Sequence, residues 1–221
     1  DEDLGIANGH VTCGVSKHTP GVLGGIWAPP FISSDFRAAW RIDGQPLASE
    51  TGLTWRPQST LDHFAQAGLR ADAATWLVPG ERCIVQALRL TVADGAVQEV
   101  EIALECGGSL ERVARWEFAR PQGKAVAARA MAGDVITLTQ GDAALVVQAA
   151  GLGSATDTGY EERMKVKPGT PAMIFVTYAL GANADAARAI GAKALAVAQA
   201  DTAAFAPRAT MAAITANTAM P

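Results

Sequence analysis

The chain has 221 residues, of which 49% are hydrophobic and 18% are charged, and its formal net charge is −4 at pH 7. This composition is typical of a globular chain and excludes disorder over most of its length. Lysine and arginine are scattered, so no surface is predicted to bind the phosphates of a nucleic acid. No apolar run approaches the ~20 residues that span a bilayer. We therefore expect neither nucleic acid nor a membrane as a partner.

The chain opens on Asp1-Glu2-Asp3, with neither a methionine nor an apolar leader. This fits a mature exported protein and a trimmed fragment equally well, and we expect a periplasmic or secreted location. Cys13, Cys83 and Cys106 are widely spaced without a CxxC pair. No zinc or redox motif is therefore predicted, and at most one disulfide can form within the chain. We expect the cysteines to be small buried side chains in strands.

The first third of the chain is predicted to form short antiparallel strands. Asn8-Gly9 is a turn signal followed by the weakly alternating HVTCGV, which predicts a hairpin. Asp43-Gly44 ends a strand that contains Trp40, and GLTWRP forms the next short strand, which contains Trp55. We expect these two strands to be consecutive neighbours whose large side chains meet on one side.

The clearest strands are CIVQALRLTV and VQEVEIALE, both of which alternate. In the second, the aliphatic residues share one face and glutamates line the other, which is typical of an antiparallel sheet with one wet face. Asp94-Gly95 between them predicts a hairpin. Gly133-Asp134 and Gly141-Asp142 flank DVITLTQ and predict a hairpin series. About a dozen short strands precede any helix, so the sequence predicts a mainly β protein, a sandwich or a barrel.

The character of the sequence changes at Asn183. NADAARAIGAKALAVAQAD is rich in alanine, with Asn183 as a plausible N-cap and Asp185 in the first turn. Its apolar residues fall along one side, which predicts a C-terminal helix. Residues 202–221 are low in charge and are broken by Pro207, so we interpret them as a linker.

No catalytic constellation is visible in the sequence. The GxSxG elbow, HExxH, the Walker A motif and a strand-to-helix GxGxxG are all absent. His10 and His18 lie eight residues apart without a third ligand nearby, so a metal site is not predicted. Carboxylate pairs can cleave glycosidic bonds, but Asp43 is explained by its turn with Gly44. We predict no catalytic residue, no metal ligand and no cofactor in this chain.

The five tryptophans divide into core and contact candidates. A tryptophan that alternates with aliphatic residues in a strand usually belongs to the core, so Trp40, Trp55 and Trp76 are expected there. A tryptophan among polar or Gly/Pro residues can instead stack on the apolar face of a sugar. Trp27, which lies in a Gly/Pro loop, and Trp116, which lies between Arg115 and Glu117, are the predicted contact tryptophans.

Two charged residues near Trp27 join the predicted contact set. Asp35 lies in the same aromatic-rich stretch and, unlike Asp43, has no adjacent glycine turn to explain it. Arg37 follows two residues later. The predicted substrate- or partner-binding residues are therefore Trp27, Asp35, Arg37 and Trp116.

Several segments in order carry a family resemblance: the ANGHV turn, a Gly-rich loop into WAPP, WRIDGQPL, GLTWRP, RCIVQALRLTV and FVTYALGANADAARA. Together they resemble the N-terminal β-sandwich domain of bacterial six-hairpin glycosidases, a group with glucoamylase-like, debranching-enzyme-like and rhamnosidase-like members. The resemblance implies a large antiparallel β-sandwich (supersandwich) over residues 1–180. It also implies a linker helix and tail over residues 181–221, leading towards an α/α-barrel that holds the catalytic acids. No segment of this chain matches those acids.

Three functional hypotheses follow. The leading one is a non-catalytic N-terminal domain of a glycoside hydrolase that shapes a sugar site and docks on an α/α-barrel domain or chain, which predicts an open apolar patch. The second is a free-standing carbohydrate-binding sandwich. The third is an envelope or assembly protein whose sandwich makes only protein contacts. The sequence leaves open which sugar is bound and whether the enzyme is a hydrolase or a phosphorylase.

Overall fold

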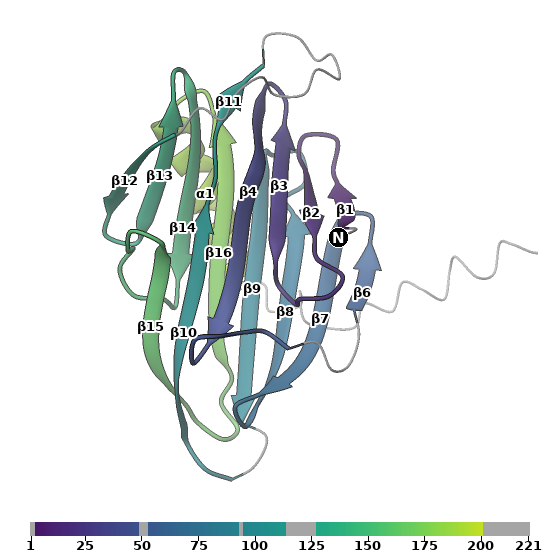
Figure 1. The fold of residues 1–221 in the computed structure, drawn as a ribbon, viewed down its shortest axis with the longest axis vertical. Coiled ribbons are helices and arrows are strands. Elements are labelled where there is room, and N and C mark those ends of the chain that lie inside the picture. Colours follow the sequence, from purple (N-terminus) through teal and green to yellow (C-terminus); the bar gives the residue numbers. More distant parts are fainter. Residues whose placement is uncertain (1–2, 49–52, 93–94, 114–126, 201–221) are drawn as a thin grey trace, which may run out of the picture.

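Two antiparallel β-sheets stack face to face, and one helix lies on the outer side of one of them (Figure 1). The computed structural model describes residues 3–48, 53–92, 95–113 and 127–200. Helix α1 (Ala184–Ala200) follows the last strand of the described chain. This architecture confirms the predicted mainly β antiparallel sandwich with a C-terminal helix.

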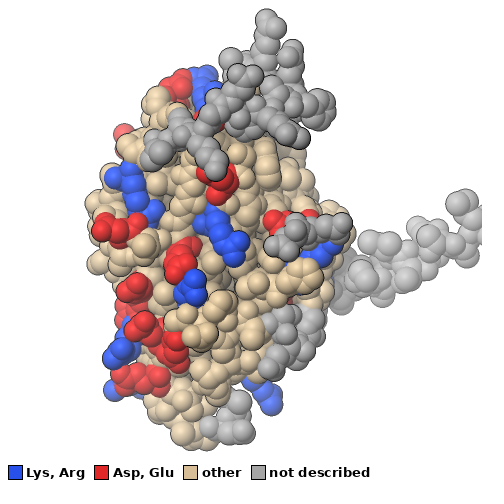
Figure 2. Space-filling model, in the orientation of Figure 1, with Lys and Arg blue, Asp and Glu red and all other residues tan. Residues whose placement is uncertain are grey.

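The front sheet faces the viewer in Figure 1. Its strand order is β1 (Leu4–Ala7), β2 (Thr12–Val15), β3 (Leu23–Ala28), β4 (Phe31–Ile42), β10 (Gln98–Gly107) and β15 (Gly159–Val166). The two-residue strands β5 (Gln45–Pro46) and β11 (Glu111–Arg112) also pair with β4. Ion pairs such as Arg41–Glu105 and Arg163–Glu101 cross its outer face. Figure 2 shows acidic and basic side chains interspersed there, as on a solvated face.

The back sheet has eight strands, and all its neighbouring pairs are antiparallel. Their order is β12 (Ala128–Ala132), β13 (Val135–Gln140), β14 (Ala143–Ala150), β16 (Ala172–Gly181), β9 (Cys83–Val92), β8 (Leu69–Leu77), β7 (Ser59–Gln66) and β6 (Leu53–Arg56). The predicted hairpins around DVITLTQ are confirmed, because β13 pairs with β12 on one side and β14 on the other.

The inner faces of the two sheets share one core. Trp40 and Phe36 from β4 and Tyr178 from β16 are among its largest fully buried side chains. The rings of Phe36 and Tyr178 meet edge to face, with centroids 5.6 Å apart and planes at 75°. This geometry suits the aromatic quadrupoles and joins the central strands of the two sheets.

A buried polar network ties the loop between β2 and β3 to the back sheet. The Gly21 amide donates to Asp62 Oδ2 at 3.3 Å, and the Gly21 carbonyl accepts from Gln86 Nε2 at 2.8 Å. Gln86 Oε1 in turn accepts from the Tyr178 hydroxyl at 2.7 Å. Gly21 has φ +65°, and a Cβ there would lie 2.8 Å from Cδ1 of Trp40. Only glycine therefore suits this position.

Helix α1 packs on the outer face of the back sheet over β14, β16 and β9. Asn183 caps it as predicted, because its Oδ1 accepts from the Ala186 amide at 2.8 Å. Small residues, Ala187, Gly191 and Ala194 among them, are buried against the sheet. A Cβ at Gly191 would lie 2.5 Å from Gln148 Oε1, so the helix approaches the strands closely. No helix within the described residues is long and apolar enough to span a membrane.

The predicted hairpin at Asp94-Gly95 is wrong. β9 pairs with β8 and β16 in the back sheet, whereas β10 pairs with β4 and β15 in the front sheet. The chain between them therefore crosses from one sheet to the other. The strands β4 and β6 are also not the neighbours that the sequence predicts, because β4 belongs to the front sheet and β6 lies at the edge of the back sheet. That prediction is therefore wrong too. A turn signal does not encode which sheet receives the next strand.

The tryptophans expected in the core occupy three different environments. Trp40 is buried as predicted, but Trp55 is 47% exposed, so that prediction is wrong. Trp55 lies opposite the buried Thr60, at the edge of the sandwich, and its indole N–H donates to the Gly5 carbonyl at 3.1 Å. Trp76 is also not between the sheets, because it lies on the outer face of β8 in a cluster with α1.

The three cysteines lie in β2, β9 and β10, and all are free and buried, which confirms the sequence prediction. Burial raises the pKa of Cys106 to about 11 and that of Cys83 to about 12. They therefore remain protonated thiols at neutral pH.

Replacing Trp40 by alanine should lower the free energy of unfolding by about 3–5 kcal/mol, because it opens a cavity between the two sheets. Trp55→Ala should cost roughly 1 kcal/mol, because half of that side chain is already in water. Urea unfolding of both variants measures the difference. Equal losses would contradict the assignment of Trp55 to the sandwich edge.

Stability should also depend on the protonation of Asp62. Burial raises its pKa from 3.8 to about 6, although the Gly21 amide and the charge of His63 lower it. The native state then holds more protons than the unfolded chain between these values, so the free energy of unfolding falls as the pH rises from about 4 to 6. The loss should be on the order of 3 kcal/mol. Urea unfolding across this range should show a flatter profile for Asp62→Asn, with Asp157→Asn at an exposed position as the control.

Candidate functional site

Two hollows lie on opposite outer faces of the sandwich. The first, called the Trp27 hollow, has a volume of about 450 Å³ and lies on the front sheet over β1 to β4. The second, called the α1 groove, has a volume of about 540 Å³ and lies on the back sheet between α1 and strands β6 to β8. Both volumes fall in the range of small-molecule sites.

Glycines form the floor of the Trp27 hollow. Gly5 pairs with Gly14 in the adjacent strand, and Gly14 pairs with Gly24 in the next. A Cβ at Gly14 would lie 2.9 Å from the Gly24 carbonyl oxygen and 3.2 Å from the Asp3 side chain. The space over Gly5 is open, whereas the Asp3 side chain lies over Gly14 and Gly24. A molecule in the hollow would therefore meet the Gly5 backbone and the Asp3 carboxylate.

The ring of Trp27 is held along one side of this floor. β3 carries a bulge between Gly24 and Ile26, and Gly25 within it has φ +52°. A Cβ at Gly25 would lie only 2.4 Å from Cη2 of Trp27. The indole therefore lies over Gly25, half-buried on the outer face of the sheet. The prediction of a loop here is wrong, because Trp27 lies within β3.

Charged side chains complete the lining of the Trp27 hollow. Asp3, Asp35 and Arg37 all line it, and Arg37 pairs with Gly24 at the end of the glycine row. Asp35 Oδ1 accepts from the Ser109 amide at 2.7 Å and also from the Ser109 hydroxyl. Asp35 therefore has a structural task, because it fixes the segment that follows β10.

The structure brings three of the four predicted contact residues together. Trp27, Asp35 and Arg37 lie in one hollow, although they come from two strands. Trp116 lies outside the described residues. The sequence prediction missed Asp3 and the glycine row. The available signal was the presence of glycine in each of three successive short strands.

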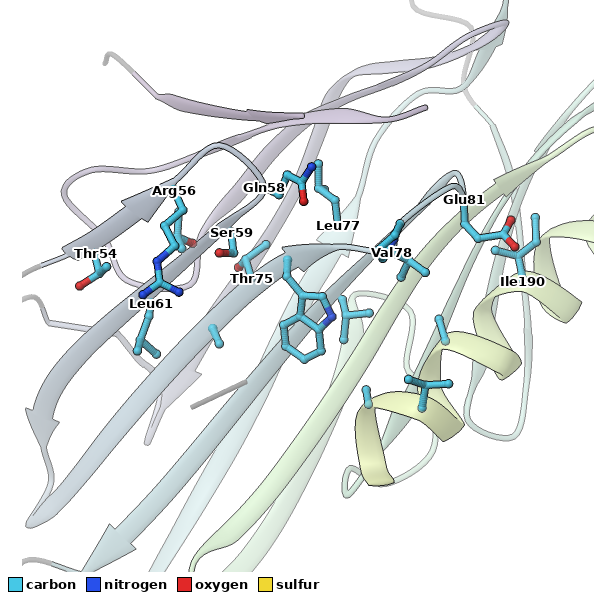
Figure 3. A pocket seen from close by; sticks show the side chains of 18 of the residues that line it. Thr54, Arg56, Gln58, Ser59, Leu61, Thr75, Leu77, Val78, Glu81 and Ile190 are labelled. Atoms are coloured by element: carbon cyan, nitrogen blue, oxygen red, sulfur yellow. The ribbon is translucent and has the colours of Figure 1, made fainter. Parts of the chain in front are cut away.

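The α1 groove has an apolar floor and two unlike walls. Trp76, Leu61 and Val85 from three adjacent strands line its base. One wall is the helix, with Ile190, Ala194 and Val197, and the other is the β6–β7 hairpin. Figure 3 shows Thr54 and Arg56 on the hairpin side, with Ile190 on the helix across from them. None of these residues was predicted to belong to a site, because α1 is distant from these strands in the sequence.

An ion-pair row lies beside the α1 groove. His63, Asp72 and Arg89 are direct cross-strand neighbours on β7, β8 and β9. His63 Nδ1 lies 2.5 Å from Asp72 Oδ1, and Arg89 pairs with the other carboxylate oxygen. The carboxylate thereby orients the imidazole, and His63 also lines the groove. Within the described residues, no group of three or more His, Cys, Asp or Glu side chains is arranged to hold a metal ion.

Large exposed apolar side chains are dispersed over the described part of the molecule. They are Trp55, Val97, Met131 and Val197, which come from four separate segments. Val197 is the most exposed, at 62%, and it lines the α1 groove. Within the described residues, these side chains do not form the broad open apolar patch that was expected from the sequence.

No family model and no curated protein matches the chain. Among solved structures, a bacterial glucoamylase complexed with acarbose matches 88% of this chain over 36% of its own length, with a TM-score of 0.52 and 7% identity. A proposed aldose 1-epimerase of Escherichia coli K12 matches 81% of this chain over 99% of its own, with a TM-score of 0.51 and 8% identity. A proposed kojibiose phosphorylase from the human microbiome gives a TM-score of 0.35 at 13% identity.

The TM-scores of the first two matches show a shared fold. Their sequence identities are very low, so the likeness extends to the fold alone. The chain spans only about a third of the glucoamylase chain that it matches, but nearly all of the epimerase chain. This sandwich fold therefore occurs both as part of a longer protein and as almost a whole chain.

Asp35→Ala should destabilise the protein by about 1–3 kcal/mol, because two donors of the nearly buried Ser109 lose their acceptor. Asp35→Asn keeps an acceptor oxygen and should restore most of this loss. Arg37→Ala, at an exposed neighbouring position, should change stability by less than about 0.5 kcal/mol. Thermal or urea unfolding of the three variants tests this order, and a larger loss in Arg37→Ala would refute the anchoring role of Asp35.

Proposed function

We propose that this chain is a non-catalytic N-terminal domain of a carbohydrate-active enzyme, of the glycoside hydrolase kind. In this proposal the Trp27 hollow forms one wall of a sugar site, and the domain docks on an α/α-barrel that supplies the catalytic carboxylates. A periplasmic or secreted location is part of the proposal and rests on the sequence alone.

The match to a bacterial glucoamylase carries this proposal. The same sandwich there makes up about a third of a longer chain that was crystallised with acarbose. Here α1 follows β16 directly and lies on the outer face of the back sheet, so the chain leaves the sandwich on that side.

The Trp27 hollow has the chemistry that a sugar site needs. An indole offers a flat apolar face to the C–H side of a pyranose ring, and a guanidinium and carboxylates can bond its hydroxyls. Trp27, Arg37 and Asp3 supply these groups. The hollow is shallow, which fits one wall of a site better than an enclosed pocket.

A second candidate is a free-standing carbohydrate-binding sandwich. The epimerase match favours it, because in that protein the fold accounts for 99% of the chain. The two candidates differ in what the isolated chain does. A module should bind sugar tightly through Trp27 by itself, whereas an enzyme domain should need its helical partner to complete the site.

The test is to purify the tagged chain from its source cells and to assay hydrolysis and phosphorolysis of maltose, cellobiose and kojibiose in the purified fraction. We expect sugar-cleaving activity to accompany the chain together with a helical domain or partner. Trp27→Ala should then raise KM roughly tenfold and leave kcat nearly unchanged, because a stacking contact is lost equally from the bound substrate and the transition state.

The control is Met131→Ala, which removes a half-exposed apolar side chain outside both hollows. It should leave KM unchanged. Absence of any accompanying sugar-cleaving activity would reject the enzyme domain, and tight Trp27-dependent binding by the isolated chain would establish the module instead.

A further inference from the structure

Trp76 lies in the α1 groove, where its side chain is only partly buried. Alternation along β8 places Trp76 on the outer face with Ala74 and Asp72, away from the core between the sheets. Helix α1 packs over β14, β16 and part of β9. Trp76 lies beside the helix, on the strand next to β9. A large aromatic side chain therefore lies at the base of a pocket of about 540 Å³.

The two walls of the groove differ in chemistry. The helix wall is apolar, with Ile190, Ala194 and Val197. The hairpin wall carries hydroxyl, amide and guanidinium groups from Thr54, Arg56, Gln58 and Ser59, which project beside the groove in Figure 3. An apolar helix packed into this space would remove the hairpin groups from water without bonding them, which is costly. The lining therefore suits a ligand that is apolar on its faces and polar around its edge.

Two of the charged side chains that line the groove compensate each other. Glu81 and Lys193 lie at the end near the helix, with a carboxylate oxygen 3.8 Å from the ammonium nitrogen, so they compensate each other. The hairpin wall offers both donors and acceptors, which match the hydroxyl groups of a polyol. A pyranose ring meets each of these conditions, since it presents C–H groups on its faces and hydroxyls around its rim.

We propose that the α1 groove is a second carbohydrate-binding site, in which a pyranose ring stacks on Trp76. Arg56, Gln58 and Ser59 bond its hydroxyls, and the α1 side chains cover its other flank. The choice of a sugar among amphipathic ring molecules rests on the proposed function. The site itself is separate from the Trp27 hollow, because it lies on the opposite face of the sandwich.

The test is a calorimetric titration of the full chain with maltotriose, cellotriose and kojibiose. We expect at least one of these to bind, and Trp76→Ala to weaken the binding at least tenfold. Trp55→Ala is the matched control, because it removes a tryptophan of the same sheet outside the groove.

A second variant changes an exposed residue, so that it tests the groove without disturbing buried packing. Val197 is 62% exposed on α1, so Val197→Arg should fold normally while its longer side chain obstructs the mouth of the groove. Val97→Arg changes a 52% exposed valine outside the groove and is its control. Loss of binding in Val197→Arg but not in Val97→Arg would support the site even if Trp76→Ala were unstable.

The outcomes separate this inference from the proposed function. Binding that survives in Trp76→Ala and Val197→Arg but is lost in Trp27→Ala would overturn the groove and leave the Trp27 hollow standing. No binding of any sugar to the folded chain would also overturn the groove, without touching a site that a second domain completes. Binding that depends on Trp76 and not on Trp27 would support the groove. This holds even if Trp27→Ala leaves the KM of the assembled enzyme unchanged, a result that would reject only the role proposed for the Trp27 hollow.

Discussion

The two sheets are locked together by the backbone of Gly21. Its amide and carbonyl are both buried and both bonded, to Asp62 and Gln86 on two strands of the back sheet, and Gln86 is bonded in turn to Tyr178. Removing any member would strand a buried polar group, which costs far more than the net value of one hydrogen bond. The contact with Trp40 excludes a side chain at Gly21, so network and packing specify the same loop. The loop that carries Gly21 therefore has one defined position on the back sheet.

The position of this loop also sets that of the Trp27 hollow. Gly21 lies two residues before β3, so the network fixes where that strand begins. The bulge at Gly25 then directs the Trp27 side chain to the outer face of the sheet. The register before the bulge places Gly24 beside Arg37. The floor and the aromatic side of the hollow therefore depend on a polar network in the core of the sandwich. Preorganisation of this kind lowers the entropic cost of binding a ligand.

The sequence was sufficient for local structure and insufficient for the pairing of the sheets. The turn at Asn8-Gly9, the hairpins around DVITLTQ and the cap at Asn183 each depend on a few adjacent residues, and all are as predicted. The partners of β9 and β10 depend on contacts between residues far apart in the chain, which alternation does not encode. The clustering of Trp27, Asp35 and Arg37 followed from proximity in sequence, whereas the α1 groove combines β6 to β8 with a helix more than a hundred residues later.

The tryptophans show why alternation alone misjudges which large side chains are available to a ligand. Trp40 and Trp55 both point inward, yet only Trp40 lies in a central strand with a sheet above it, and Trp55 projects past the sandwich edge. Trp27 and Trp76 both point outward, and each is partly buried because a bulge or a helix covers one side of the ring. Exposure is decided by position within the sheet and by what lies over it. Since the two outward tryptophans face opposite directions, a domain that covered one hollow would leave the other open.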